Sequence, residues 1–180
     1  MSRQKSFSRP KYFSGKLLTA EDFQDEQNYF VEKRRLHNRY IHGFGIVCGL
    51  DISLKDESLI VEAGYALDCE GNDIVICEPF EMDLPDKDKK EVFVGLKYHE
   101  VETEPVPQIK MPEHTEEDST LYSRIQESFE IQYETENPLS KHRLDKCGVC
   151  EEQHSIPIGR LKYRSGTWRR NWWFRLLKIK

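Results

Sequence analysis

The feature that most constrains the fold is the stretch from Ala20 to His42, which contains neither proline nor glycine. Thr19 and Asp22, just at its start, resemble a capping box in which Asp replaces the usual Glu or Gln. Acidic residues lie early in the stretch and basic residues lie late, as the helix macrodipole favours. The sequence therefore predicts a helix over residues 20–41 that ends before Gly43.

The apolar stripe of this helix is thin. Phe23, Phe30 and Ile41 fall near one line, and most of the remaining positions are polar or charged. A helix of this kind usually either contacts a partner or is stabilised by its own side-chain pairs.

After Gly43 the hydrophobic period changes to that of strands. Runs rich in β-branched residues, separated by glycine and turn residues, predict strands near 45–54, 58–63, 65–69 and 73–78. Later strands are expected at 91–102, around Phe129, Ile131 and Tyr133, and on both sides of an "RSGT" turn. The predicted fold class is α+β, with one long N-terminal helix packed beside a mostly antiparallel β-sheet or small β-barrel.

We expect three regions along the chain. Residues 1–18 form an N-terminal arm, 19–165 a single α+β domain, and 166–180 a tail rich in Trp and Arg. The acidic, proline-bearing segment 103–120 is expected to be a long loop within the domain.

Composition narrows the class of protein. A length of 180 residues with 37% hydrophobic content suffices for one core, and no run approaches the roughly 18 apolar residues of a membrane span. The N-terminus lacks the apolar centre of a secretory signal, so we expect synthesis and assembly in the cytoplasm and no direct membrane insertion. Residues 1–16 and 160–180 are basic and contain no acid, whereas the region between them is strongly acidic. Such an acidic body would repel nucleic acid.

The cysteines divide into two groups. His142, Cys147, Cys150 and His154 are spaced as ligands of one structural zinc ion, the one cofactor that the sequence suggests. The alternative is a surface loop of reduced thiols, and a redox role is disfavoured because no helix follows the Cys-x-x-Cys pair. The other three cysteines lie in strand-like text and are expected to be small buried hydrophobes: Cys48, Cys69 and Cys77.

A catalytic metal site is a weaker hypothesis. His37 and His42, with Asp68 or Asp73, could form the site of a metal-dependent hydrolase. Histidines at a helix end are explained as well by the macrodipole, and the sequence contains no nucleophile elbow, Walker loop or His-Glu-x-x-His motif. We therefore expect no enzyme activity.

The C-terminal tail combines aromatic and basic residues, as protein anchors often do. Stacking on nucleic acid, contact with a membrane surface and completion of the core are the alternatives. The candidate partner-binding residues here are Trp168, Arg169, Arg170, Trp172, Trp173 and Arg175.

The sequence also carries a family resemblance. The motif Tyr-Phe-x-Gly-x-Leu-Leu-Thr-Ala-x-Asp-Phe, the helix end "RRLHNRY" and the segment "GYALD" resemble proteins encoded beside the baseplate genes of contractile injection systems and phage tail-like particles. The match covers about residues 10–80, with looser similarity at "YSRIQESFEIQY" and "IPIGRL".

This resemblance implies a non-catalytic structural or adaptor subunit at or near the baseplate of a multi-protein particle, which other subunits contact and which can leave the cell with an extracellular particle. The polar helix would then lie between subunits. Its apolar residues and those just before it would be partner-binding: Tyr12, Phe13, Leu17, Leu18, Phe23 and Phe30. The alternative is a small zinc-stabilised module that binds a protein or a glycan.

Overall fold

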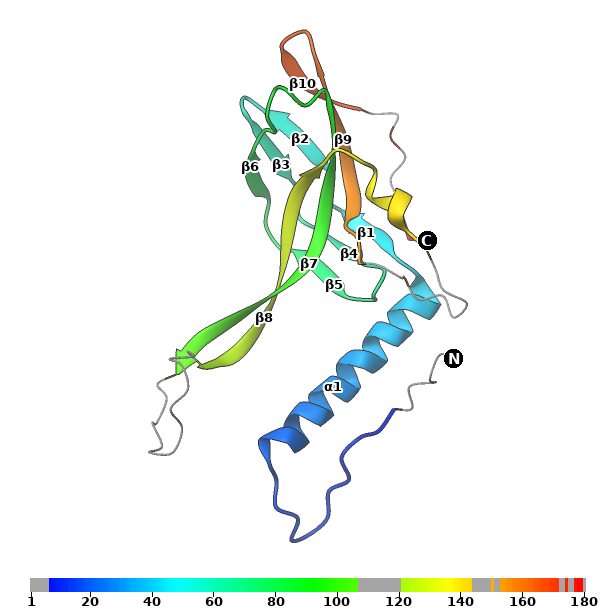
Figure 1. Cartoon of the computed structure of the whole chain (residues 1–180), viewed down its shortest axis with the longest axis vertical. Coiled ribbons are helices and arrows are strands. Elements are labelled where there is room, and N and C mark those ends of the chain that lie inside the picture. The colour runs from blue at the N-terminus through cyan, green and yellow to red at the C-terminus, as the bar shows by residue number, and fades with distance from the viewer. Residues whose placement is uncertain are drawn as a thin grey trace.

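The computed structural model describes residues 7–106, 121–143, 150, 153–171, 174 and 177–179. In this part of the chain one α-helix precedes ten strands arranged in three sheets, so the α+β class is confirmed. Figure 1 shows how these elements lie in space. The elements are α1 (Ala20–His37), a π-helical turn (Asn38–His42), β1 (Gly45–Gly49), β2 (Ile52–Lys55), β3 (Ser58–Val61), β4 (Gly64–Leu67), β5 (Asp73–Ile76), β6 (Phe80–Asp83), β7 (Glu91–Val106), β8 (Leu121–Glu134), a 3₁₀ turn (Pro138–Lys141), β9 (Ile156–Arg164) and β10 (Thr167–Arg170).

Helix α1 begins where the sequence predicts. The Asp22 backbone N–H donates to Thr19 Oγ1 at 3.3 Å, and the Thr19 N–H donates to Asp22 Oδ2 at 3.2 Å. Both halves of the capping box are therefore present. The helical path continues through the π-helical turn and ends at Gly43, whose φ of 75° ordinary residues rarely adopt.

The three sheets share one hydrophobic core. Their strand orders are β1-β4-β5, β2-β3-β6 and β10-β9-β7-β8, and the neighbouring strands in each sheet run antiparallel. Apart from Leu50, which lies between β1 and β2, the largest fully buried side chains come from these strands: Ile46, Leu59, Val61, Ile74, Ile76, Val92, Val94, Leu96, Ile156, Ile158 and Leu161. Phe129, Ile131 and Tyr133 pack against this core from β8, as their alternation predicts.

The single strand expected over 45–54 is wrong. The strand is interrupted at Gly49 and Leu50, which have φ values of 63° and 58°, and β1 and β2 join different sheets. A Cβ at Gly49 would lie 2.1 Å from the Ala63 carbonyl oxygen, so the two backbones meet too closely for a side chain. The bend turns Leu50 fully into the core.

Strands β7 and β8 form a long hairpin that extends beyond the other strands, on the same side as α1 (Figure 1). The pairing continues through Thr103 with Arg124 to Val106 with Leu121. The prediction of a loop over 103–120 is therefore wrong for residues 103–106, which belong to β7. The rest of that segment, 107–120, lies outside the described residues. Strand β6, a short strand that pairs with β3, was not predicted from the sequence.

Within the described part of the chain, no helix has the length and apolar character that a membrane span requires.

Candidate assembly interface and cysteine–histidine cluster

The turn between β4 and β5 receives the C-terminal end of α1. Asp68 shapes this turn, because its Oδ1 accepts the N–H groups of Glu70 at 2.9 Å and Asn72 at 2.8 Å. Gly71 has a φ of 87°, and a Cβ there would lie 2.2 Å from the Arg35 carbonyl oxygen. The turn therefore touches the helix backbone directly.

Four side chains near the C-terminal end of α1, which we call the helix clamp, hold the helix to this turn and to the neighbouring strands: Arg34, Arg35, Asn38 and Arg39. Asn38 is only 7% exposed, and its Nδ2 donates to the Gly71 carbonyl at 2.9 Å. Arg35 donates to Asn72 Oδ1 at 2.5 Å, and Arg39 donates to the Glu70 carbonyl at 3.3 Å.

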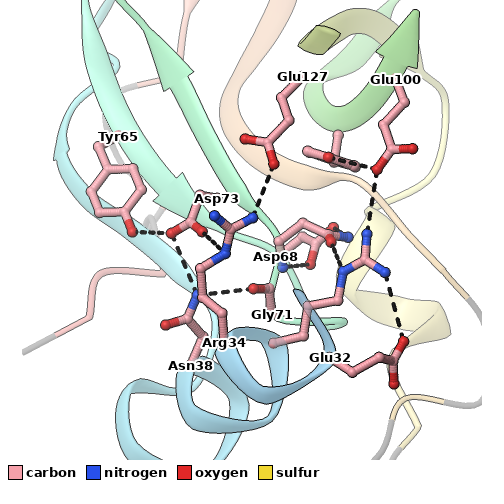
Figure 2. A network of polar contacts seen from close by, with 12 residues as sticks. Glu32, Arg34, Asn38, Tyr65, Asp68, Gly71, Asp73, Glu100 and Glu127 are labelled. Atoms are coloured by element: carbon pink, nitrogen blue, oxygen red, sulfur yellow. Dashed lines mark hydrogen bonds and ion pairs between the residues drawn. The ribbon is translucent and has the colours of Figure 1, made fainter. Parts of the chain in front are cut away.

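The clamp also reaches β5, β7 and β8 through ion pairs, drawn in Figure 2. Arg34 lies 3.1 Å from Asp73 and 2.9 Å from Glu127, while Arg35 lies 3.5 Å from Glu100. The hydrogen bond to Glu127 raises the pKa of Arg34. Asp73 also accepts from Tyr65 at 2.5 Å, and burial together with this bond raises the pKa of Tyr65 to about 12. One end of α1 is thus fixed by a connected polar network.

Apart from the clamp, α1 is unusual in that none of its 18 residues is buried. Phe23 is 51% exposed and Phe30 is 62% exposed. An isolated helix of this length is marginal in water, because helices in proteins gain most of their stability from packing an apolar face.

The N-terminal arm runs alongside α1 and adds exposed apolar side chains to those of the helix. Tyr12 donates to Glu26 at 3.1 Å, and the Lys16 ammonium lies 2.6 Å from Asp22. The bond from Lys16 lowers the pKa of the Asp22 carboxyl. A groove of about 590 Å³ remains between arm and helix, lined in part by Phe7 and Tyr29.

The six partner-binding residues predicted in this region are all exposed, and we call them the arm–helix surface: Tyr12, Phe13, Leu17, Leu18, Phe23 and Phe30. Phe13 is 66% exposed and Leu17 is 83% exposed. The structure thus leaves large apolar side chains of the arm and of α1 exposed within the described part of the chain.

The tail differs from the expectation at its first candidate residue, Trp168. Trp168 is buried in the core, where its indole N–H donates to the Pro85 carbonyl at 3.0 Å and its ring packs on Tyr163. This corrects the hypothesis that Trp168 anchors a partner, because a side chain inside the core presents no surface to one. Arg170 donates to the Ile52 carbonyl at 2.9 Å and serves contacts within the chain.

The structure describes only one of the other candidate tail residues besides Arg170. Arg169 is exposed on β10 and stays a candidate partner contact. Trp172, Trp173 and Arg175 lie outside the described residues, so their role stays a prediction.

The second candidate site is a cluster of cysteine and histidine side chains. The ligand atoms of Cys69, Cys150 and His154 all lie within 4.8 Å of one another. His142 joins them, with its Nδ1 2.8 Å from His154 Nε2 and 3.4 Å from Cys150 Sγ. Burial raises the pKa of the Cys69 thiol and lowers the pKa of His142.

This cluster changes the ligand set expected from the sequence. Three of its four members are predicted ligands, whereas Cys147 lies outside the described residues. Cys69 was expected to be a buried hydrophobe, and it is indeed buried, but its thiol faces the cluster. Cys48, on β1, and Cys77, just after β5, are exposed, so their expected burial is wrong. No local signal connects Cys69 to a motif so distant in the chain.

The histidines of the hydrolase hypothesis gain no support. His37 and His42 are exposed with ring centroids 5.3 Å apart, and Asp68 and Asp73 are engaged in the turn and the clamp. Within the described residues, the cluster of possible metal ligands contains neither His37 nor His42.

Comparison with known proteins shows similarity of fold. No protein-family model matches the chain, and no curated protein matches it. A chain in the cryo-electron microscopy structure of the type VI secretion system TssK-TssF-TssG baseplate subcomplex matches with a TM-score of 0.57 at 15% identity, covering 95% of this chain and 62% of that one.

Two further structures match in the same way. A chain of the baseplate complex from the type VI secretion system has a TM-score of 0.52 at 16% identity, covering 92% of this chain and 58% of that one. The crystal structure of TssK has a TM-score of 0.53 at 13% identity, covering 92% of this chain and 41% of that one. This chain thus spans less than two thirds of the length of the chains it matches.

Proposed function

We propose that this protein is a non-catalytic structural subunit of the baseplate of a contractile injection system, with other subunits of the particle as its partners. Two independent lines support the proposal. The N-terminal motif resembles proteins encoded beside such baseplate genes, and the fold is similar to chains from type VI secretion system baseplates. The motif resembles proteins of contractile injection systems and of phage tail-like particles alike, so either kind of assembly is included in the proposal.

The observation that carries this function is a helix with no buried residue beside an exposed apolar arm. A helix fixed at one end by polar contacts, with apolar side chains left in solvent, is suited to lie between subunits. Large apolar side chains exposed together on one part of a protein are typical of interaction sites.

The energy available at the arm–helix surface matches what assembly requires. Each large apolar side chain contributes about 1.5–3 kcal/mol when it becomes fully buried. Six such residues, already partly buried, can together offset the roughly 4–15 kcal/mol that association costs in lost freedom.

The same proposal sets where the protein works. We propose that it assembles with its partners in the cytoplasm and leaves the cell only within a complete particle. Its acidic central region, which would repel nucleic acid, agrees with partners that are proteins.

Assembly can be tested with the double variant Leu17→Ser and Phe30→Ser. Both side chains are more than 60% exposed, so the variant should fold with a free energy of unfolding within about 1 kcal/mol of the wild type. Its incorporation into purified particles, measured by quantitative mass spectrometry, should fall at least about tenfold, because each position loses about 1 kcal/mol or more at the interface.

Val75→Ser is the matched control, because Val75 is 54% exposed on β5 and lies outside the arm–helix surface. This variant should incorporate at the wild-type level. Normal incorporation of a well-folded double variant would contradict the proposed interface, and absence of the wild-type protein from purified particles would contradict the function itself.

A further inference from the structure

We propose that Cys69, His142, Cys150 and His154 bind one zinc ion that stabilises the contact of the sheets with the C-terminal end of α1. This goes beyond the role in assembly, and it replaces the sequence-derived ligand Cys147 with Cys69. The four residues come from three separate places in the chain: the turn after β4, the end of the 3₁₀ turn, and the segment leading into β9. Only the folded chain can form this set.

The spacing of the donor atoms fits a tetrahedral site. Zinc binds nitrogen at about 2.0–2.1 Å and sulfur at about 2.3 Å, so ligand atoms at tetrahedral angles lie about 3.3–3.8 Å apart. The Cys150 Sγ to His142 Nδ1 distance is 3.4 Å, and Cys69, Cys150 and His154 lie within 4.8 Å of one another. The 2.8 Å between the two histidine nitrogens needs to widen by roughly 0.5 Å, which a small rotation of either ring provides.

Hydrogen bonds around the cluster orient two of the ligands. His154 Nδ1 lies 3.0 Å from the Ser155 carbonyl, which places the ring proton on Nδ1 and leaves the Nε2 lone pair facing His142. The backbone N–H of His154 donates to the Cys69 sulfur, which holds this side chain in the cluster. These are outer contacts typical of a built metal site.

An aromatic side chain covers the cluster. The Phe44 ring centroid lies 4.4 Å from that of His142 and 5.6 Å from that of His154. Cys69 is 4% exposed and His154 is 7% exposed, so water reaches these donors poorly. Four protein ligands in a site shielded on one side give the closed coordination of a structural ion, with no position left for a substrate.

The chemistry of the donors selects zinc. Two thiolates and two imidazoles form a soft, tetrahedral set, which suits zinc better than magnesium or calcium, whose ligands are oxygens. The consequence for the fold is local, because Cys69 lies between Asp68 and Glu70 in the turn that the helix clamp grips. An ion at Cys69 would stiffen that turn and, through it, the direction of α1.

The test is the metal content of the purified full-length protein after equilibration with one equivalent of Zn²⁺ and removal of free metal. Wild type should hold about one zinc per chain. Cys69→Ser should lose it, while Cys77→Ser, a change at an exposed cysteine, and Cys147→Ser should retain it. Replacement by Co²⁺ should give the visible spectrum of tetrahedral coordination with thiolate charge-transfer bands in wild type.

Because Cys69 is buried, its variant could unfold for a reason unrelated to metal. His142→Ala, at a half-buried position, provides a second test, because this variant should still fold. Its zinc affinity should fall by more than about 100-fold, since loss of an outer contact alone costs roughly 10- to 100-fold. A chelator should lower the melting temperature of wild type and leave that of His142→Ala unchanged.

Three results would overturn the proposal. Wild type could fail to retain zinc. Cys147→Ser could lose the metal while Cys69→Ser keeps it, which would restore the sequence-derived ligand set. Mass spectrometry of the unreduced protein could find Cys69 and Cys150 joined as a disulfide, which would remove both thiolates.

Discussion

Replacing Gly71 by alanine should push α1 away from the sheets. The new Cβ would lie 2.2 Å from the Arg35 carbonyl oxygen, whereas carbon and oxygen atoms normally approach to about 3.3 Å. The helix or the turn must therefore move by about 1 Å. Such a shift stretches the bonds from Asn38 to the Gly71 carbonyl and from Arg35 to Asn72.

The expected cost has two parts. An alanine at the left-handed φ of 87° costs about 1–2 kcal/mol by itself. Each clamp hydrogen bond that breaks costs about 0.5–1.5 kcal/mol more, so the total is about 2–5 kcal/mol. Gly166 supplies the matched control, because its φ is 83° and a Cβ there meets nothing within 4 Å. Gly166→Ala should show only the backbone cost.

The decisive assay is amide hydrogen exchange, with urea unfolding as the measure of global stability. Because α1 has no buried residue, its release leaves the core of the sheets intact, and the loss appears mainly as local opening. Amides in the last two turns of α1 should exchange at least about tenfold faster in Gly71→Ala, since each 1.4 kcal/mol is a factor of ten. The exchange rates of amides in β7 and β9 should rise no more in Gly71→Ala than in Gly166→Ala. Equal effects of the two variants, with exchange in α1 unaltered, would refute this account of the clamp.

Two further substitutions test the core and the helix start. Trp168→Ala should lower the free energy of unfolding in urea by about 3–5 kcal/mol at low and at high salt alike, because Trp168 lies in the core; a loss under 1 kcal/mol would contradict that placement. The hydrogen bond from Lys16 is the main cause that lowers the pKa of Asp22 in the folded protein. The ionised Asp22 carboxylate therefore stabilises the helix start at pH values above its pKa in the unfolded chain, and this contribution is lost as the pH falls through its pKa in the folded protein. Helical circular dichroism of wild type should therefore decrease in acid, and Asp22→Asn should remove part of that decrease; an identical acid profile in both proteins would count against it.

The features that the sequence predicted well depend on neighbours along the chain. The capping pair Thr19 and Asp22 marks the start of α1, and Gly43 marks the end of the helical path. The "RSGT" turn between β9 and β10 was likewise confirmed, because Ser165 and Gly166 adopt the positive φ values that a tight hairpin needs. Such signals act over a few residues, so they survive without knowledge of the fold.

Contacts between distant segments decided the rest. The break at Leu50 arises because β1 and β2 pair with different strands, and β7 runs past residue 102 because β8 pairs with it residue by residue. The burial of Trp168 depends on Pro85 and Tyr163, neither of which lies beside it in the sequence.

The sequence by itself determined that this chain has a capped, polar N-terminal helix, antiparallel strands and a set of cysteines and histidines near its C-terminal end. Those properties follow from periodicity, turn chemistry and residue type, which are local. Only the tertiary structure decided that α1 is held by a polar clamp with its apolar residues exposed, and that Cys69 joins His142, Cys150 and His154. The physical reason is that both arrangements depend on where the β4–β5 turn lies in space, which is set by the packing of the sheets around their common core.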